Sequence, residues 1–184
     1  ATCRGRGLHP KRCSLNVRPH EGHHPRNQEY SVSSEKQVQF VVTINAPVPT
    51  VWRLMIGPES YKRWAAPFAE GTYFEGSWEQ GTKIKFLSPP SGDGMLSEIA
   101  ERRNNEFISI RHLGMISNGV EDTTSESVLA WAPAYENYTF ISVPEGTTLL
   151  VDLDIPGEWV EYMNDAWPKA LMALKQLSEF ERAA

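Results

Sequence analysis

The sequence predicts an α+β fold in which a curved antiparallel sheet wraps around one long C-terminal helix, with two short helices after the first strand. The long helix is expected over 158–181, because apolar residues recur there at spacings of three and four. Two strands, over 135–143 and 147–154, precede it and are joined by a turn that contains Pro144 and Gly146. A sheet wrapped around a helix tends to enclose a pocket, so the chain is expected to hold a molecule there.

The remaining elements are predicted from local patterns taken in chain order. Alternating or short apolar runs indicate strands, and Pro49 is tolerated in the first turn of a short helix. Pro168 cannot donate a hydrogen bond to Asn164, so a kink is expected in the long helix. The other expected elements are a strand at 38–44, helices at 49–55 and 59–64, strands at 72–78, 82–87, 95–103 and 107–115, a loop at 117–120 and a helical turn at 123–131. The expected order is one strand, two short helices, six strands and the long helix.

Alternation along the strands predicts a sheet with one covered face and one face in water. The expected inward residues are apolar, and the long helix is expected to cover them. They are Ile84, Phe86, Met95, Ile99, Ile108, Ile110, Leu149, Val151 and Leu153. Several expected outward neighbours are charged, namely Lys83, Lys85, Glu98, Asp152 and Asp154.

Composition and charge divide the chain into two parts. The 184 residues are 40% hydrophobic and 22% charged, which is typical of one soluble globular domain. Residues 1–33 hold six basic and two acidic side chains and show no periodicity, so we expect a disordered basic leader before a domain at 34–184. The acidic remainder argues against a nucleic-acid partner. With no apolar run long enough for a membrane span, the net charge of −5 fits a cytoplasmic protein.

Motifs for cofactors, metals and nucleophiles are missing from the sequence. Cys3 and Cys13 lie in the leader with four of the five histidines, but at none of the spacings that zinc sites use. Neither a Gly-x-Ser-x-Gly motif nor a phosphate-binding glycine loop occurs. The sequence therefore predicts no metal and no cofactor.

His112 is the only histidine of the expected domain, so any imidazole base must be this residue. Alternation places it on the same strand face as Ile108 and Ile110, toward the interior. It is either a structural histidine bonded to a neighbour or a base that works with a carboxylate such as Glu98 or Glu136.

An acidic group lies near the expected helical turn, and it has two interpretations. Glu121, Asp122, Glu126 and Glu136 could supply an acid and a base if burial separates their pKa values. Alternatively, Asp122 is the N-cap of a helix that starts at Thr123.

The chain also resembles a known superfamily over residues 36 to about 180. The matching segments are 44–47 through Val51-Trp52, Trp64, 76–86, 111–114, 119–122, Trp131, 135–139 and 167–171. These segments resemble the helix-grip fold of the START-like (SRPBCC, Bet v 1-like) superfamily. Within it, the chain looks like the branch named after the activator of heat-shock protein 90 ATPase.

The resemblance implies three functions. Most members of the superfamily bind apolar or aromatic small molecules, lipids or polyketides between helix and sheet, and we expect the same here. A minority are cavity enzymes of the cyclase or hydrolase kind, which here would use His112. The third function is a protein-interaction module of the chaperone-ATPase-activator type. The residues expected to border a cavity are Trp131, Tyr138, Met163, Trp167 and His112.

Overall fold

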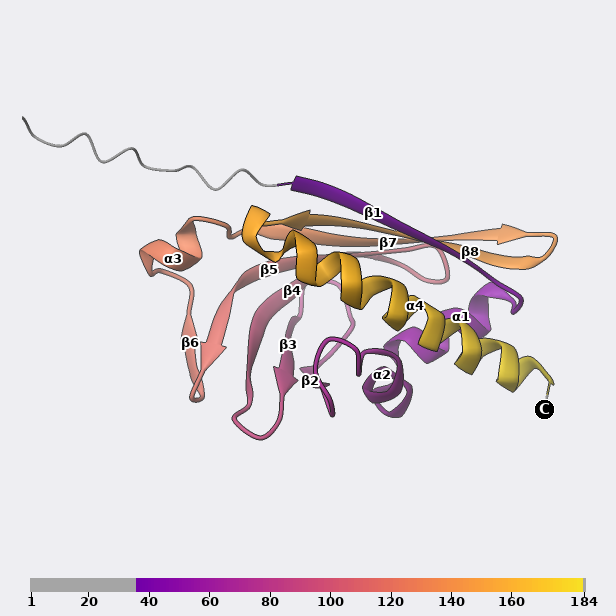
Figure 1. Ribbon diagram of the computed structural model, residues 1–184, viewed down its shortest axis with the longest axis horizontal. Helices are drawn as coiled ribbons and strands as arrows, with labels where there is room; N and C mark the ends of the chain where they lie inside the picture. The colour runs from indigo at the N-terminus through magenta and orange to yellow at the C-terminus, as the bar shows by residue number, and fades with distance from the viewer. Residues whose placement is uncertain (1–35, 184) are drawn as a thin grey trace, which may run out of the picture. The chain divides into compact units, whose positions relative to one another are not determined.

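In the computed structural model, which describes residues 36–183, an antiparallel sheet curves around the long helix α4 (Figure 1). The strand order is β1-β8-β7-β5-β4-β3-β2, and β6 pairs with β5 beside this path. The strands are β1 (Lys36–Ile44), β2 (Tyr73–Gly76), β3 (Lys83–Ser88), β4 (Asp93–Arg103), β5 (Phe107–Ser117), β6 (Val120–Asp122), β7 (Ala134–Val143) and β8 (Gly146–Ile155). The predicted leader, with both cysteines and the other four histidines, lies outside the described residues.

Helices account for the rest of the regular structure. They are α1 (Val48–Ile56), α2 (Pro58–Trp64), α3 (Glu126–Leu129), a short 3₁₀ turn (Gly157–Trp159) and α4 (Val160–Ala183). Both α1 and α2 carry a proline in the first turn, where its missing amide hydrogen costs nothing. The long helix continues through Pro168. The fold class expected from the sequence, a helix-grip arrangement with two short helices after the first strand, is confirmed.

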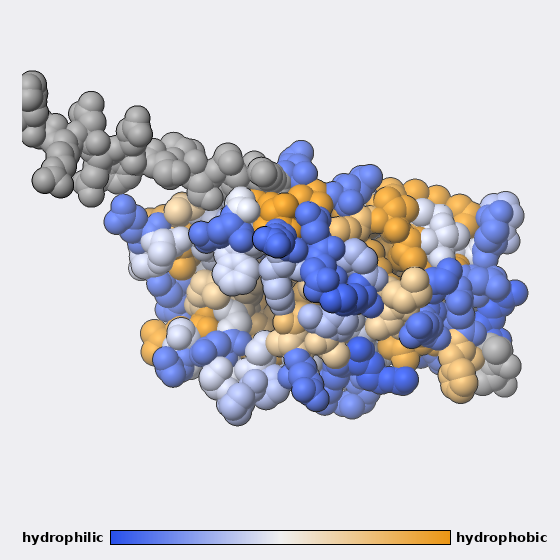
Figure 2. Space-filling model, viewed as in Figure 1, coloured by the Kyte–Doolittle hydropathy of each residue, from blue (hydrophilic) through white to orange (hydrophobic). Residues whose placement is uncertain are grey.

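The inner face of the sheet carries the core. Ile84, Ile99, Ile108 and Ile110 are fully buried there, as alternation predicted. The inner side of α4 packs on this face through Trp167, Ala170, Leu171 and Leu174. Figure 2 shows hydrophilic and hydrophobic residues interspersed on the face of the molecule along which α4 runs. Among residues 36–183, no helix is long and apolar enough to cross a membrane.

Four sequence predictions differ from the structure. Trp159 and Phe180, expected on the buried side of the long helix, are 50% and 77% exposed, because Trp159 lies in the 3₁₀ turn before α4 and Phe180 in the last turn of α4. The expected loop at 117–120 leads into a further strand, β6. The outer face also holds a small apolar cluster of Leu87, Leu96 and Ile116, so it is not uniformly polar.

The fourth difference concerns the cap of α3. Ser125 is the N-cap, because its side chain accepts a hydrogen bond from the amide of Val128. Asp122 instead accepts from the amides of Thr124 and Ser125, at 3.0 and 2.9 Å. Hydrogen bonding from the Ser125 side chain, and then from the amides of Ser125 and Thr124, stabilises the carboxylate and lowers the pKa of Asp122. Asp122 therefore shapes the turn that leads into α3 rather than capping the helix.

Candidate functional site

Four polar side chains lie together on the largely apolar inner face of the sheet. Ser97 on β4, His112 on β5, and Glu136 and Tyr138 on β7 form this group, which we call the polar row. Register brings them together, because Ser97 pairs directly with His112, while Glu136 and Tyr138 pair with the inward-facing Ile110 and Ile108 of β5. Glu136 is therefore the diagonal neighbour of His112 across two adjacent strands.

The members of the polar row form a chain of contacts that runs from Ser97 through His112 and Glu136 to Tyr138. Ser97 Oγ lies 2.8 Å from His112 Nδ1, and His112 Nε2 lies 3.6 Å from Glu136 Oε2. The hydroxyl of Tyr138 donates to Glu136 Oε1. The side chains of His112 and Glu136 are only 9% and 19% exposed. Such a buried polar group in an apolar interior can hold a proton or orient a bound molecule.

Burial keeps two tyrosines of this region protonated. Burial first, and then the charge and hydrogen bond of Glu136, raise the pKa of Tyr138 well above its usual value. Burial, followed by the charge of Glu136, likewise raises the pKa of Tyr61 on α2. Both phenols are therefore hydrogen-bond donors at neutral pH.

Four aromatic rings from α2 and the β2–β3 hairpin pack beside the polar row. Tyr61, Phe74, Trp78 and Phe86 form this group, which we call the aromatic cage. Tyr61 lies 5.2 Å from Phe74 and 5.9 Å from Phe86, and Trp78 lies 5.5 Å from Phe74 and 5.7 Å from Phe86, between ring centroids. The ring of Phe86 is 6.5 Å from that of His112, so the cage and the polar row adjoin.

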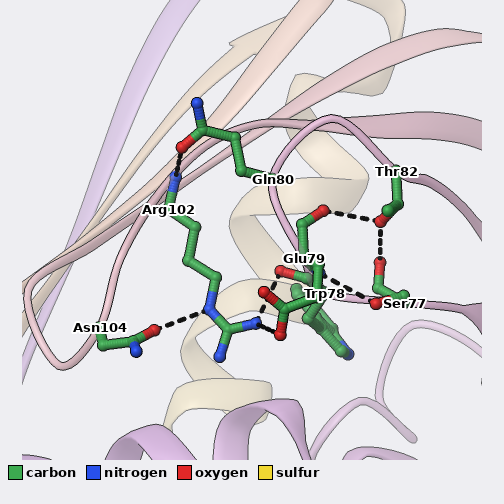
Figure 3. Close-up of polar contacts among 7 residues, drawn as sticks. All are labelled: Ser77, Trp78, Glu79, Gln80, Thr82, Arg102 and Asn104. Carbon is green, nitrogen blue, oxygen red and sulfur yellow. Dashed lines mark hydrogen bonds and ion pairs between the residues drawn. The ribbon is translucent and has the colours of Figure 1, made fainter.

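Arg102 fixes the loop that carries Trp78 (Figure 3). Its Nη1 donates to the carbonyl of Trp78 at 3.1 Å and to Glu79 Oε1 at 2.5 Å, and its Nε donates to Asn104 Oδ1 at 2.9 Å. The guanidinium also lies 5.7 Å from the ring centre of Trp52 on α1. One side chain thus joins the β2–β3 turn, the β4–β5 turn and α1.

Two buried indole groups that both contact the ring of Tyr61 differ in their hydrogen bonding. Nε1 of Trp64 donates to the carbonyl of Met55 at 3.0 Å. Nε1 of Trp78 is buried and has no partner within 36–183, which is also true of Nε of Arg111 on the outer face. An unsatisfied buried donor costs about 1–3 kcal/mol. A ligand that accepted a hydrogen bond from Trp78 would recover part of this cost.

The α4 side of the interior is built around Trp167. Its ring lies 6.1 Å from Tyr138, 5.9 Å from Phe40 on β1, and 4.9 Å from Phe68, which follows α2. Met163, one turn earlier on α4, is half-buried against the same core. Trp167 therefore connects the helix with both the polar row and the segment between α2 and β2.

The structure brings four of the five expected binding residues into one region. Tyr138, Trp167 and Met163 belong to the same core, and His112 reaches Tyr138 through Glu136. Trp131 follows α3 and is half-buried, and no ring contact within residues 36–183 links it to the others.

The carboxylates named with His112 are separated by the sheet. Glu136 lies beside His112, whereas Glu98 pairs with Arg111 at 3.8 Å on the opposite face. Within the acidic group, Glu121 forms an ion pair with Lys85 at 2.7 Å on the surface. Paired acidic chemistry at 121–126 is therefore not supported by the geometry, and the polar row holds a single carboxylate.

Sequence reasoning missed Ser97, Tyr61 and Trp78 as members of this region. Ser97 carried a usable signal, because alternation places it inward between Met95 and Ile99. Tyr61 and Trp78 carried none, since their positions depend on how α2 and the β2–β3 loop fold over the sheet.

Two surface hollows lie away from this region. One, of about 650 Å³, is lined by residues of 45–49 and 140–146, with Arg182 at its side. The other, of about 570 Å³, lies on the outer face of β1, β8 and β7. Neither hollow is lined by any of the five expected binding residues. Within the described residues, no group of three histidine, cysteine or acidic side chains is arranged to hold a metal ion.

Comparison with known proteins establishes the fold. Neither a family model nor a curated protein matches the chain. A protein from Mesorhizobium loti matches with a TM-score of 0.60 at 16% identity, over 81% of this chain and 99% of that one. The Aha1 dimer from Colwellia psychrerythraea matches with a TM-score of 0.58 at 16% identity, over 78% and 96%.

A third solved structure is DynU16, from the dynemicin biosynthetic locus. It matches with a TM-score of 0.55 at 20% identity, over 76% of this chain and 46% of that longer chain. At such low identities these likenesses show the fold alone. The described domain has a START-like, helix-grip fold.

Proposed function

We propose that this protein binds an apolar or aromatic small molecule, or a lipid, between the inner face of the sheet and α4. The observation that carries the proposal is the polar row, a buried group of hydrogen-bonding side chains set in an aromatic interior. Ligand sites combine apolar walls with a few polar groups that fix orientation. The START-like fold, shared with a protein of a biosynthetic locus, is compatible with this function.

The residues proposed to contact the ligand lie at the junction of helix and sheet. Tyr138 and Trp167 supply aromatic walls, and His112 supplies a polar contact. Met163 is half-buried and unbranched, so its side chain can move to admit a ligand. Trp131, which follows α3, stays a predicted contact at the edge of this region.

The test is native mass spectrometry of the full chain purified from its source cells, compared with the denatured mass. A reproducible excess mass lost on denaturation supports binding. Met163→Trp fills the proposed space and should abolish the excess, whereas Met172→Trp places the same ring at a half-exposed position of the same helix and should preserve it. No excess mass, or an excess that Met163→Trp leaves unchanged, would contradict the proposal.

A cavity enzyme is the second candidate, and the contact between His112 and Glu136 favours it. A carboxylate 3.6 Å from an imidazole nitrogen can orient the ring for proton transfer. This candidate predicts that His112→Asn abolishes turnover of a bound substrate while the far-ultraviolet circular dichroism stays unchanged. Undiminished turnover would remove it.

A protein-interaction module is the third candidate, and exposed aromatic rings favour it. Trp159 and Tyr162 lie 6.0 Å apart at the start of α4, and both are at least 40% exposed. The shared fold with an Aha1 dimer is compatible with an interaction of that kind. The candidate predicts that Trp159→Ser weakens binding to a chaperone ATPase, measured by calorimetry, and the absence of any binding would exclude it.

A further inference from the structure

We propose that Trp78 donates the hydrogen bond that orients the ligand, and that the ligand is a neutral planar molecule with an acceptor oxygen, such as an aromatic ketone. This inference rests on the proposed function and specifies its ligand chemistry. Its basis is that Nε1 of Trp78 is a fully buried donor without a partner in residues 36–183. Nearly all buried donors in folded proteins are paired, so an unpaired one points to a bound acceptor.

Trp64 shows that the fold can satisfy a buried indole in the same neighbourhood. Trp64 and Trp78 are 2% and 7% exposed, and both pack against Tyr61. Trp64 donates to the backbone carbonyl of Met55. The missing hydrogen-bond partner of Trp78 Nε1 therefore follows from the position of this residue in the aromatic cage.

Arg102 holds that position in place. Its bond to the carbonyl of Trp78 fixes the backbone from which the indole extends. In Figure 3 the indole points away from the guanidinium, so Arg102 holds the residue without occupying its ring nitrogen. On the other side, Phe74 and Phe86 pack against the ring, which limits its rotation toward water.

The surroundings of Trp78 define the class of ligand. An indole N–H can only donate, so the partner atom must be an acceptor. The rings of Tyr61, Phe74 and Phe86 favour a flat apolar body that can stack or meet them edge-on. Burial penalises a charged acceptor, and the Glu136 carboxylate of the adjoining polar row repels an anion. A carbonyl or ether oxygen on a planar molecule satisfies all three conditions.

The experiment compares two probes that differ by one carbonyl, fluorenone and fluorene. Each is titrated into the full chain while the six tryptophan indole N–H signals are followed by nitrogen–proton correlation NMR. We expect fluorenone to bind about three- to tenfold more tightly than fluorene, the range of one net hydrogen bond. We also expect the Trp78 signal to move downfield with fluorenone only. Trp78→Phe identifies that signal by its loss and should remove the preference.

Trp159→Phe is the matched control, because it removes an indole at a half-exposed position and should keep the preference for fluorenone. Equal affinities for the two probes, with the Trp78 signal unmoved, would overturn the inference and leave the proposed function standing. Failure of both probes to bind would count against the proposed function and the inference with it. If Trp78→Phe does not fold, the Trp78 signal is identified by triple-resonance assignment of the unaltered chain, and its movement with fluorenone decides.

Discussion

Ser97 and His112 occupy opposed positions on β4 and β5, and the Ser97 hydroxyl lies 2.8 Å from Nδ1 of His112. This contact occupies one ring nitrogen and leaves Nε2 directed toward Glu136. Ser97 is fully buried, and its hydroxyl is already engaged. Ser97 therefore positions the imidazole, and His112 and Glu136 are the members of the polar row that can act on a bound molecule.

Loss of the Ser97 hydroxyl should destabilise the fold. Ser97→Ala leaves the ring nitrogen of His112 without its partner, so we expect the free energy of unfolding to fall by about 1–3 kcal/mol. Urea denaturation measures the change. Ser109→Ala, at a buried serine of β5 on the other face, should cost less than about 1 kcal/mol. Equal losses in the two variants would contradict the positioning role of Ser97.

Tyr61 and Tyr138 should make the protein less stable in alkali. Burial raises the pKa of both phenols above the usual value of 10.0, so the unfolded chain loses these protons first. Their contribution to stability is therefore complete below about pH 10 and is lost as the pH rises further, by up to about 1.4 kcal/mol per pH unit for each tyrosine.

Urea denaturation at several pH values between about 8 and 11 measures this slope. Tyr138→Phe should make the slope shallower, because it removes one of the two phenols whose pKa burial raises. A slope that Tyr138→Phe does not change would show that Tyr138 ionises alike in the folded and unfolded states.

Arg102→Lys should loosen the β2–β3 turn even though it keeps the charge. Lysine cannot donate in the planar fork that reaches Trp78, Glu79 and Asn104 together, so we expect a loss of about 1.5–3 kcal/mol. Thermal and urea unfolding measure it. Arg103→Lys is the control, because its side chain is 52% exposed against 15% for Arg102, and we expect a change within about 0.5 kcal/mol. A similar small change in both variants would contradict the role of Arg102 in joining the β2–β3 and β4–β5 turns.

Gly114→Ala should displace β6 from β5. A β-carbon on Gly114 would lie 2.1 Å from the carbonyl oxygen of Asp122, which is backbone and cannot swing away. We expect a loss of about 1–3 kcal/mol and faster amide hydrogen exchange in β6. Ser117→Ala, at an exposed position near the end of the same strand, should leave both quantities nearly unchanged. Unaltered exchange in Gly114→Ala would show that the two strands do not approach this closely.

The elements that could be predicted are those with a strong period. The spacing of Met163, Trp167, Ala170 and Leu174 identifies α4, and alternation identifies β7 and β8. The three residues of β6 could not be predicted, because they are polar or exposed and have no period. Their pairing depends on the absence of a side chain at Gly114, which a pattern of hydrophobicity does not register.

The candidate site could be predicted only in part, for a related reason. Alternation along one strand correctly predicted that His112 faces the interior, and the same pattern could have predicted this for Ser97. The choice between Glu98 and Glu136 required the register between β5 and β7, which are separated in the chain by β6 and α3. Long-range register is set by tertiary packing, and one sequence does not display it.

The two halves of α4 are held unequally. Its C-terminal half bonds to the β1–α1 corner: Glu179 accepts from the amide of Asn45 at 2.8 Å, and Lys175 donates to the carbonyl of Thr43 at 2.6 Å. Near its start, Tyr162 donates to the carbonyl of Phe68, and Pro168 lacks an amide hydrogen. The C-terminal half of α4 is thus held by more side-chain hydrogen bonds to the rest of the domain than the N-terminal half. Because fewer side-chain bonds hold the N-terminal half, we expect amides before Pro168 to exchange faster than those after it, and a guest molecule to enter beneath that half.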